Sequence, residues 1–326
     1  MTISAEQLAQ YERDGFLIIE GMFSDDDLQP VIDEIAGAVD SLARRLFEAG
    51  RITSAYADEG FYARMAKVAA DYDEAPGLMQ ISTPMGPQLA ALWSSDRLLG
   101  IVAAIIGPDI EGGAIWNVRP KVPENVLMTV PWHQDSGYLA PGGQGTAQPA
   151  CWIPLLDVGE ENGCLQVVRG GHRPSGNARH KVEKVIGDPR SWYLYIDEDD
   201  LPPGDVVTCA MRKGSVLFIH ENMPHRGLWN RSNGVRWAID VRWQRPSDPT
   251  GLEGVLIRGP RMRRGDDPTF RPDMMAWAQE EREKYDAWVN RGDGDPLNPA
   301  IDGSWYFARW DPAFRADEAA QAGEPA

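Results

Sequence analysis

The sequence is poor in cysteine. It has only three, Cys151, Cys164 and Cys209, and no two of them stand at the close spacing of a CxxC pair. An odd number of cysteines without close pairing indicates neither a disulfide framework nor a zinc knuckle. Since cysteine is among the most often buried residue types, we expect the three thiols to be small core residues.

The chain also lacks an excess of positive charge and a long apolar run. Lysine and arginine number 32 against 49 aspartates and glutamates, for a net charge of −17, which repels nucleic acids and anionic membranes. No uninterrupted apolar stretch approaches the roughly 20 residues that cross a bilayer. The N-terminus has no basic segment followed by an apolar run. We therefore expect a cytoplasmic monomer or homodimer that acts on a small molecule, with no nucleic-acid or membrane partner.

One basic segment departs from the acidic average. The stretch "RGPRMRRGDDPTFR", residues 258–271, gathers five arginines, but Asp266 and Asp267 interrupt it and no aromatic pattern for stacking bases accompanies it. We interpret it as a solvated or domain-contact segment rather than as an anion site.

The first part of the sequence predicts helices. Ser4 with Gln7 three residues later is a capping-box pattern, which opens a short helix that stops at Gly15, before a strand in "FLIIEG". Ser24 begins a second helix, whose apolar residues recur at steps of three and four until Gly50. A third helix is expected from residue 96 to residue 107. Residues 51–94 are poorly patterned.

From residue 114 the sequence changes to short β-rich runs between turn residues. The runs are "AIWNVR" (114–119), "NVLMTVPWH" (125–133), "ACWIPLLDV" (150–158), "GCLQVV" (163–168), "DVVTCA" (205–210), "SVLFIH" (215–220) and "VRWAIDVRW" (235–243). Strands without intervening helices exclude a parallel βαβ sheet and indicate an antiparallel sandwich or barrel. The predicted fold is mainly β, with the N-terminal helices packed on one sheet.

We expect a single domain over residues 1–315. It consists of a helical part (1–110), a β-rich core (about 111–245) and a C-terminal extension (246–315) with a helix in "DMMAWAQEEREKYDAWVNR". The remaining residues, 316–326, have the composition of a disordered tail.

The stretch "MTVPWHQDSGYLAPG" contains two candidate metal ligands. His133 and Asp135 are separated by one residue, so on an extended strand both side chains would project from the same face. The alternative is a surface turn in which Asp135 caps the following loop through "DSG".

A third ligand has few candidates, because the chain has five histidines. His220 and His225 lie where the buried run in "GSVLFIHENMPHRG" ends, whereas His180 is expected in solvent and His172 in a locally bonded loop. Two imidazoles and one carboxylate form the facial triad of non-haem iron(II) oxygenases, which leaves coordination positions open. Zinc more often takes a tetrahedral set with a thiolate or a third histidine.

An oxo-acid co-substrate on such a metal needs a cation for its distant carboxylate, best supplied by a planar guanidinium. Arg236 stands 11 residues after His225, across "NRSNG", so a hairpin there would bring it beside the metal. The alternative is a cross-strand salt bridge on the outer face of the sheet. Arg242 lies on the same face of the expected strand and competes for either role.

Together these motifs resemble the phytanoyl-CoA dioxygenase family. The similar segments are "YERDGFLIIEGMFSDDDL", "PWHQD", "ENGCLQVVRGGHR" and "MRKGSVLFIHENMPHRGLWNRSNGVRWAI", in the family's order over most of residues 5–245. The resemblance implies a double-stranded β-helix core (jelly-roll, cupin-like). It also implies an Fe(II)- and 2-oxoglutarate-dependent dioxygenase that consumes O2 and releases succinate and CO2. The resemblance implies hydroxylation, and the acidic charge favours a small metabolite or natural-product intermediate as the substrate.

The resemblance also assigns roles. It makes His133, Asp135 and His225 the catalytic iron ligands, which leaves His220 as a core or supporting residue. It gives Arg236 the far carboxylate of 2-oxoglutarate. Candidates to line the rest of the co-substrate pocket are Gln134, Trp152 and Lys121.

Two features qualify the resemblance. Many family members carry a serine two residues after the distal histidine, where this chain has Gly227. Halogenating relatives lack the carboxylate, so Asp135 disfavours halogenation.

Substrate contacts are expected near the mouth of the core, with the segment after Pro246 as a lid or subunit contact. The expected contacts are Trp116, Asn117, Tyr138, Arg242 and Trp243. Two other functions stay open: a cupin-like metalloenzyme that does not use 2-oxoglutarate, and a non-catalytic binding protein on the same fold. The four intact residues of the iron and co-substrate sites disfavour the second.

Overall fold

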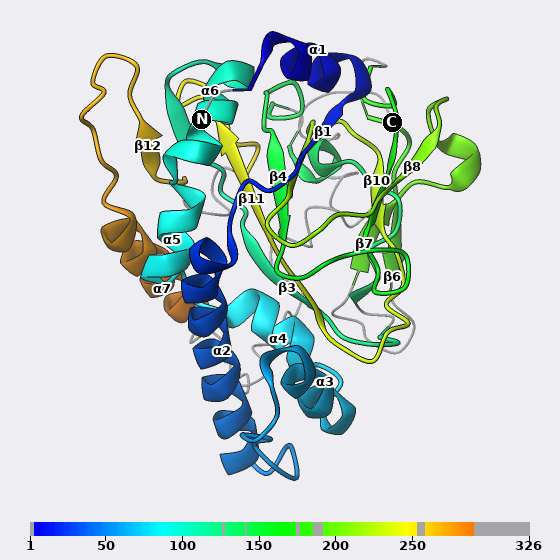
Figure 1. Cartoon of the computed structure of the whole chain (residues 1–326), viewed down its shortest axis with the longest axis vertical. Coiled ribbons are helices and arrows are strands. Elements are labelled where there is room, and N and C mark those ends of the chain that lie inside the picture. Colours follow the sequence, from blue (N-terminus) through cyan, green and yellow to red (C-terminus); the bar gives the residue numbers. More distant parts are fainter. Residues whose placement is uncertain are drawn as a thin grey trace, which may run out of the picture.

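The computed structural model describes residues 3–125, 128–140, 142–173, 177–184, 192–252 and 258–289. Two antiparallel sheets form its centre, with helices against the larger one, as Figure 1 shows. The end of the expected C-terminal extension and the expected tail lie outside the described residues.

The N-terminal elements confirm the capping patterns. Helix α1 (Ala5–Asp14) has the capping box between Ser4 and Gln7 and ends at Gly15, whose φ of 80° is left-handed. Strand β1 (Phe16–Ile19) follows, and α2 (Asp25–Glu48) begins with a second capping box, between Ser24 and Asp27.

Residues 51–94, which lacked a clear pattern, form three short helices. They are α3 (Phe61–Asp71), α4 (Ala75–Ser82) and α5 (Pro87–Trp93), and none has a side-chain cap. Helix α6 (Asp96–Ile106) follows as predicted. By length and composition alone, Pro87–Ile106 would be long enough to cross a membrane, but 56% of its most apolar window is buried inside the protein. Core helices commonly have this character.

The larger sheet has the order β1-β9-β4-β11-β2-β12, and β3 also pairs with β11. The smaller sheet has the order β10-β5-β8, and β6 pairs with β7. The strands are β2 (Ile110–Gly112), β3 (Asn117–Lys121), β4 (Ala150–Pro154), β5 (Leu165–Val168), β6 (Lys181–Lys184), β7 (Trp192–Tyr195), β8 (Val206–Cys209), β9 (Val216–Ile219), β10 (His225–Gly227), β11 (Arg236–Gln244) and β12 (Arg261–Arg263). Every strand pair is antiparallel, which confirms the predicted sheet type.

The predicted hairpin between His225 and Arg236 is wrong. Strand β10 pairs with β5 in the smaller sheet, whereas β11 pairs with β3, β4 and β2 in the larger one. The segment "NRSNG" therefore connects the two sheets. Asn230 holds this connection by donating to the carbonyls of Lys121 and Gly234.

Strand β11 separates the hydrophobic core from the site. All nine of its residues are buried. Its odd-numbered residues join the core under the helices, and these are Trp237, Ile239, Val241 and Trp243. Because side chains alternate along a strand, the even-numbered residues face the other way, toward the smaller sheet. A second apolar cluster between the sheets includes Cys164 and Cys209. All three cysteines are free and buried, as predicted.

The C-terminal extension packs on the helical side. Helix α7 (Met274–Val289) places Trp277 edge-on against Trp93 of α5, with ring centroids 5.5 Å apart. In the arginine-rich segment, Arg258 pairs with Glu111 at 2.6 Å and Arg261 with Asp109 at 2.5 Å. These ion pairs join two arginines of the segment to acidic residues at and before β2.

Candidate metal centre

The ligand pair lies on a turn, not on a strand. His133 makes only an isolated bridge, and Asp135 begins a short 3-10 helix, Asp135–Tyr138. The prediction that one face of an extended strand presents both side chains is therefore wrong. The two side chains still converge, because the chain turns between them.

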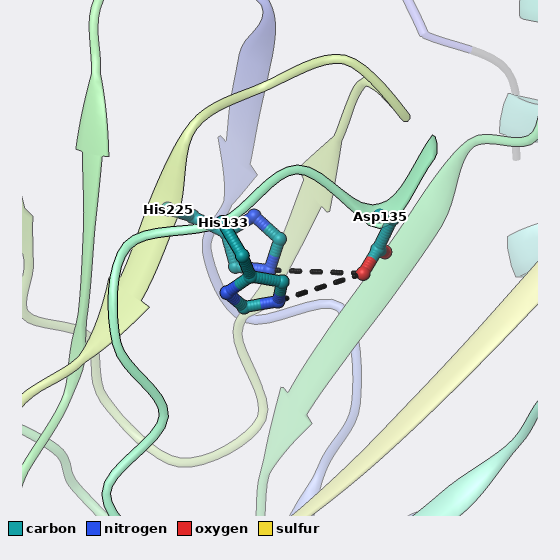
Figure 2. A group of neighbouring side chains, drawn as sticks. All are labelled: His133, Asp135 and His225. Atoms are coloured by element: carbon teal, nitrogen blue, oxygen red, sulfur yellow. Dashed lines mark ion pairs between the residues drawn. The ribbon is translucent and has the colours of Figure 1, made fainter. Parts of the chain in front are cut away.

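The third candidate comes from the smaller sheet. The backbones of His133 and His225 exchange two hydrogen bonds, of 3.0 and 2.9 Å, so the rings lie side by side with centroids 4.1 Å apart. Their Nε2 atoms lie 3.8 and 4.0 Å from the same oxygen of Asp135, Oδ1. Dashed lines mark the two contacts in Figure 2. One atom from each of the three residues lies within 4.8 Å of the other two. The three residues could hold one metal ion.

Backbone carbonyls orient both imidazoles. Nδ1 of His133 lies 2.8 Å from the oxygen of Pro131, and Nδ1 of His225 lies 2.9 Å from the oxygen of Met223. When Nδ1 donates to a carbonyl, Nε2 keeps its lone pair for a metal. Burial and the neighbouring His225 lower the pKa of His133 to about 3. The imidazole is therefore neutral at pH 7, as ligation requires.

The other carboxylate oxygen of Asp135 faces Arg242. Nε and Nη2 of Arg242 donate to Oδ2 over 3.0 and 2.8 Å, and Nη1 donates to Asp240 over 2.8 Å. Arg242 was expected to contact substrate. It lines the cavity, but its guanidinium donates to these two carboxylates.

A cavity that opens to solvent adjoins the three candidate ligands. Its walls include Lys121, Trp152 and Arg236 from the larger sheet and Leu165 and Gly227 from the smaller one. Both expected sites, for metal and for co-substrate, therefore share one cavity.

Arg236 is a buried cation that forms no ion pair with another residue in the described part of the chain. Its residue surface is 3% exposed, and its Nε and Nη1 have no hydrogen-bond partner in the part of the chain that the structure describes. Its guanidinium lies 5.2 Å from the ring centre of Trp152. Burial lowers the pKa of Arg236 to about 9. A buried charge without a partner is costly, so the arrangement favours an anionic ligand here.

Lys121 lies beside Arg236. The two residues are paired across β3 and β11, and Nζ of Lys121 donates to the backbone oxygen of Leu228. Burial, followed by the charge of Arg236, lowers the pKa of Lys121 to about 6. A Cβ atom at position 227 would lie 3.0 Å from this Nζ. The lysine amine thus occupies space that Gly227 leaves open.

Gln134 is turned away from the cavity and is not among its lining residues. Its side chain donates to the carbonyl of Asn222 over 2.7 Å and accepts from the backbone N–H of Ala178 over 2.7 Å. Its own N–H donates to Nε2 of His180 over 3.0 Å. His180 is therefore partly buried against the ligand turn, which corrects the expectation that it lies in solvent.

Of the five expected substrate contacts, only Arg242 lines the cavity. Trp116 donates to Glu281 of α7 over 2.8 Å, and Asn117 donates to Asp240 over 3.1 Å. The hydroxyl of Tyr138 accepts from the N–H of Leu194 over 3.1 Å. Trp243 is wrong as a substrate contact, because it is fully buried in the core under the helices.

The sequence reasoning missed Asp240 and Arg119, which also line the cavity. Arg119 of β3 pairs with Asp240 of β11. The signal was present in "RWAIDVRW", where charged residues alternate with apolar ones along a strand that is buried on both faces.

Two antiparallel sheets that enclose a His–Asp–His site beside an open cavity define a cupin-fold oxygenase of the facial-triad class. The sequence profile described as phytanoyl-CoA dioxygenase (PhyH) matches residues 11–238, which is more than half of the chain. This chain belongs to the phytanoyl-CoA dioxygenase family. It is a 2-oxoglutarate-dependent non-haem iron dioxygenase, with iron and 2-oxoglutarate as cofactor and co-substrate.

Several relatives are similar over most of the chain. Ectoine dioxygenase of Bordetella parapertussis is 25% identical over 253 residues, which are 71% of this chain and 73% of the relative. Peroxisomal phytanoyl-CoA dioxygenase of Mus musculus is 27% identical over 249 residues, 74% and 68% of the two chains.

Two solved structures support the fold. The apo form of the non-haem monooxygenase ThoJ has a TM-score of 0.52 at 19% identity, covering 87% of this chain and all of that one. EctD from S. alaskensis with 2-oxoglutarate and 5-hydroxyectoine has a TM-score of 0.51 at 17% identity, covering 79% and 84%.

Proposed function

We propose that this dioxygenase hydroxylates a small-molecule metabolite or natural-product intermediate, with release of succinate and CO2. The observation that carries the proposal is the buried guanidinium of Arg236, which lines the same cavity as the three candidate ligands. Two of its nitrogens have no hydrogen-bond partner among the described residues. A metalloenzyme without an anionic co-substrate would have no use for a buried, unpaired cation there.

In this proposal His133, Asp135 and His225 hold Fe(II). When bound, the iron supplies O2 activation coupled to oxidative decarboxylation of 2-oxoglutarate. Two imidazoles and one carboxylate would leave coordination positions of the metal open for other ligands. The short backbone hydrogen bonds of the imidazoles keep the ligand set in place before the metal binds.

Arg236 would bind the far carboxylate of 2-oxoglutarate through two parallel hydrogen bonds. Trp152 lies against its guanidinium and excludes water from one side. Lys121, on the neighbouring strand, would add a second positive charge when protonated. Arg236 and Lys121 give the cavity a positively charged end, and Trp152 and Leu165 give it apolar walls. This combination suits a short dicarboxylate.

The proposed substrate is small because it would share the cavity beside the three candidate ligands with the co-substrate. The named relatives act on small molecules, ectoine and phytanoyl-CoA. The net charge of −17 supports a chain without a nucleic-acid or membrane partner, which we place in the cytoplasm as a monomer or homodimer.

Anaerobic titration of the metal-free protein with Fe(II) and 2-oxoglutarate tests the proposal. We expect the weak visible charge-transfer band of the iron chelate to appear at one equivalent of each. Omission of either component is the control. If the complete mixture gives no band while the protein remains folded by circular dichroism, the proposal is refuted.

The affinity for 2-oxoglutarate should fall as pH rises from 6 to 8. Below the pKa of Lys121, about 6, the amine already carries its proton. Above it, the amine must take up a proton as the carboxylate binds, because a nearby anion raises the pKa of a lysine. The dissociation constant should therefore rise by up to about tenfold per pH unit. Measuring it by the same titration at several pH values checks this.

Lys121→Met is the matched variant. It should bind 2-oxoglutarate more weakly at pH 6 and show a flatter dependence on pH. Equal slopes for the two proteins would show that Lys121 does not couple protonation to binding.

A further inference from the structure

A continuous chain of ion pairs runs from the candidate iron carboxylate across the floor of the cavity. Arg242 joins Asp135 to Asp240, at 2.8 Å on each side, and Asp240 also pairs with Arg119. The side chains of Asp135, Arg242 and Asp240 are 14%, 10% and 8% exposed. Because water screens buried ion pairs only weakly, the attraction within these pairs is stronger than in a network of ion pairs on the surface.

The contact with Arg242 makes the two oxygens of Asp135 unequal. Nε and Nη2 of Arg242 both donate to Oδ2, while Oδ1 faces the Nε2 atoms of both histidines. A carboxylate whose two oxygens are free can bind a metal through either one or both of them. With Oδ2 held by two hydrogen bonds, Oδ1 alone is directed toward the metal position.

Asp240 holds the guanidinium of Arg242 in place. Its third donor, Nη1, bonds to Oδ1 of Asp240, which also accepts from the side-chain amide of Asn117 over 3.1 Å. Burial would raise the pKa of Asp240, but the charges of Arg119 and Arg242 outweigh it and keep the pKa well below its ordinary value. Asp240 is therefore a carboxylate at any pH at which the protein functions. Only the planar fork of arginine can reach both acids in this way.

We propose that Arg242 is a positioning residue that restricts Asp135 to a single ligating oxygen, with Asp240 as its anchor. The inference rests on the proposed iron site and adds a residue that orients one of its ligands. One oxygen from Asp135 and one nitrogen from each histidine would supply three donor atoms to the metal. A second oxygen from Asp135 would take a position that the co-substrate or O2 needs.

Two other roles for Arg242 make different predictions. A substrate contact would change the KM for substrate and leave the metal site unaltered. A purely structural ion pair would change the free energy of unfolding, again without an altered metal site. Metal affinity and the ligand-field spectrum of the bound ion therefore separate positioning from both.

Co(II) is the probe, because its visible spectrum reports coordination number without turnover. The variants are Arg242→Lys and Arg242→Gln. We expect both to bind Co(II) about 10- to 100-fold more weakly than the parent. Their Co(II) spectrum should shift as the carboxylate turns. Lysine should recover part of the affinity but not the spectrum, since it keeps the charge and loses the fork.

Asp240→Asn keeps all three metal ligands and Arg242 and removes only the anchor. It decides the question if the Arg242 variants do not fold. We expect a smaller loss of Co(II) affinity, of about threefold to tenfold, with a spectral shift in the same direction. Arg64→Gln is the matched control, because Arg64 is 11% exposed and pairs with Asp40 at 2.8 Å on the helical side. It should bind Co(II) as the parent does.

The inference is overturned if folded variants of Arg242, or folded Asp240→Asn, bind Co(II) with the parent affinity and spectrum. A parent protein that binds neither Co(II) nor Fe(II) would instead refute the iron site itself. The two failures are therefore distinguishable.

Discussion

His225→Ala should lose the charge-transfer band of the Fe(II)–2-oxoglutarate complex, and with it turnover. At roughly 3 kcal/mol for each protein ligand, removal of one imidazole weakens metal binding by about a hundredfold or more. The hydrogen bonds that join the backbones of His133 and His225 do not depend on the side chain, so the variant should fold. The measurement is the anaerobic titration, with circular dichroism to verify the fold.

His220→Ala is the matched control for this prediction. His220 directly follows β9, five residues before His225. Its ring centroid lies 4.8 Å from that of His172, and it is not among the residues that line the cavity. This variant should keep the band at the parent intensity. If His220→Ala loses the band and His225→Ala keeps it, the choice between the two histidines is reversed.

Arg236→Met should have opposite effects on co-substrate binding and on stability. Loss of a buried bidentate cation should weaken binding of 2-oxoglutarate by about 2–5 kcal/mol, or roughly 30- to 5,000-fold. The free energy of unfolding of the metal-free protein should instead rise by about 1 kcal/mol or more, because methionine removes an unpaired buried charge. Titration with 2-oxoglutarate and urea unfolding measure the two effects.

Arg226→Met is the control for both effects. Arg226 lies on β10 next to His225, but its guanidinium pairs with Glu198 near the surface. This variant should bind 2-oxoglutarate normally and gain no stability. If Arg236→Met destabilises the metal-free protein, the guanidinium already has a partner in the folded chain and does not need an anionic ligand.

Much of the fold followed from local patterns. The capping boxes at Ser4 and Ser24 fixed the starts of two helices, and the short β-rich runs located most strands. Helices α3 to α5 were not predicted, because residues 51–94 show no clear apolar periodicity and none of the three helices begins with a side-chain cap. Tertiary packing, which a local pattern does not contain, stabilises helices of this length.

The sequence predicted which residues form the site better than it predicted how they are arranged. His133, Asp135, His225 and Arg236 do lie at one cavity, although neither the extended strand nor the hairpin that was to bring them together exists. Residue spacing limits which groups can meet, whereas pairing between distant strands decides how they meet. That pairing depends on the whole core.

Trp243 and Arg242 show a second limit. Both were expected to contact substrate, although they are consecutive on one strand and so must point to opposite faces. Strict use of that alternation would have separated the core tryptophan from the cavity arginine. It would also have found Asp240, two residues before Arg242 on the cavity face.

The alternation along β11 links correct folding to catalysis. A shift of one residue in its pairing would put Trp237 and Trp243 into the cavity and would bury Arg236 and Arg242 among apolar side chains under the helices. Such a misfolded molecule would lose its core and its chemistry in the same step. A form with β11 out of register should therefore be inactive, not partly active.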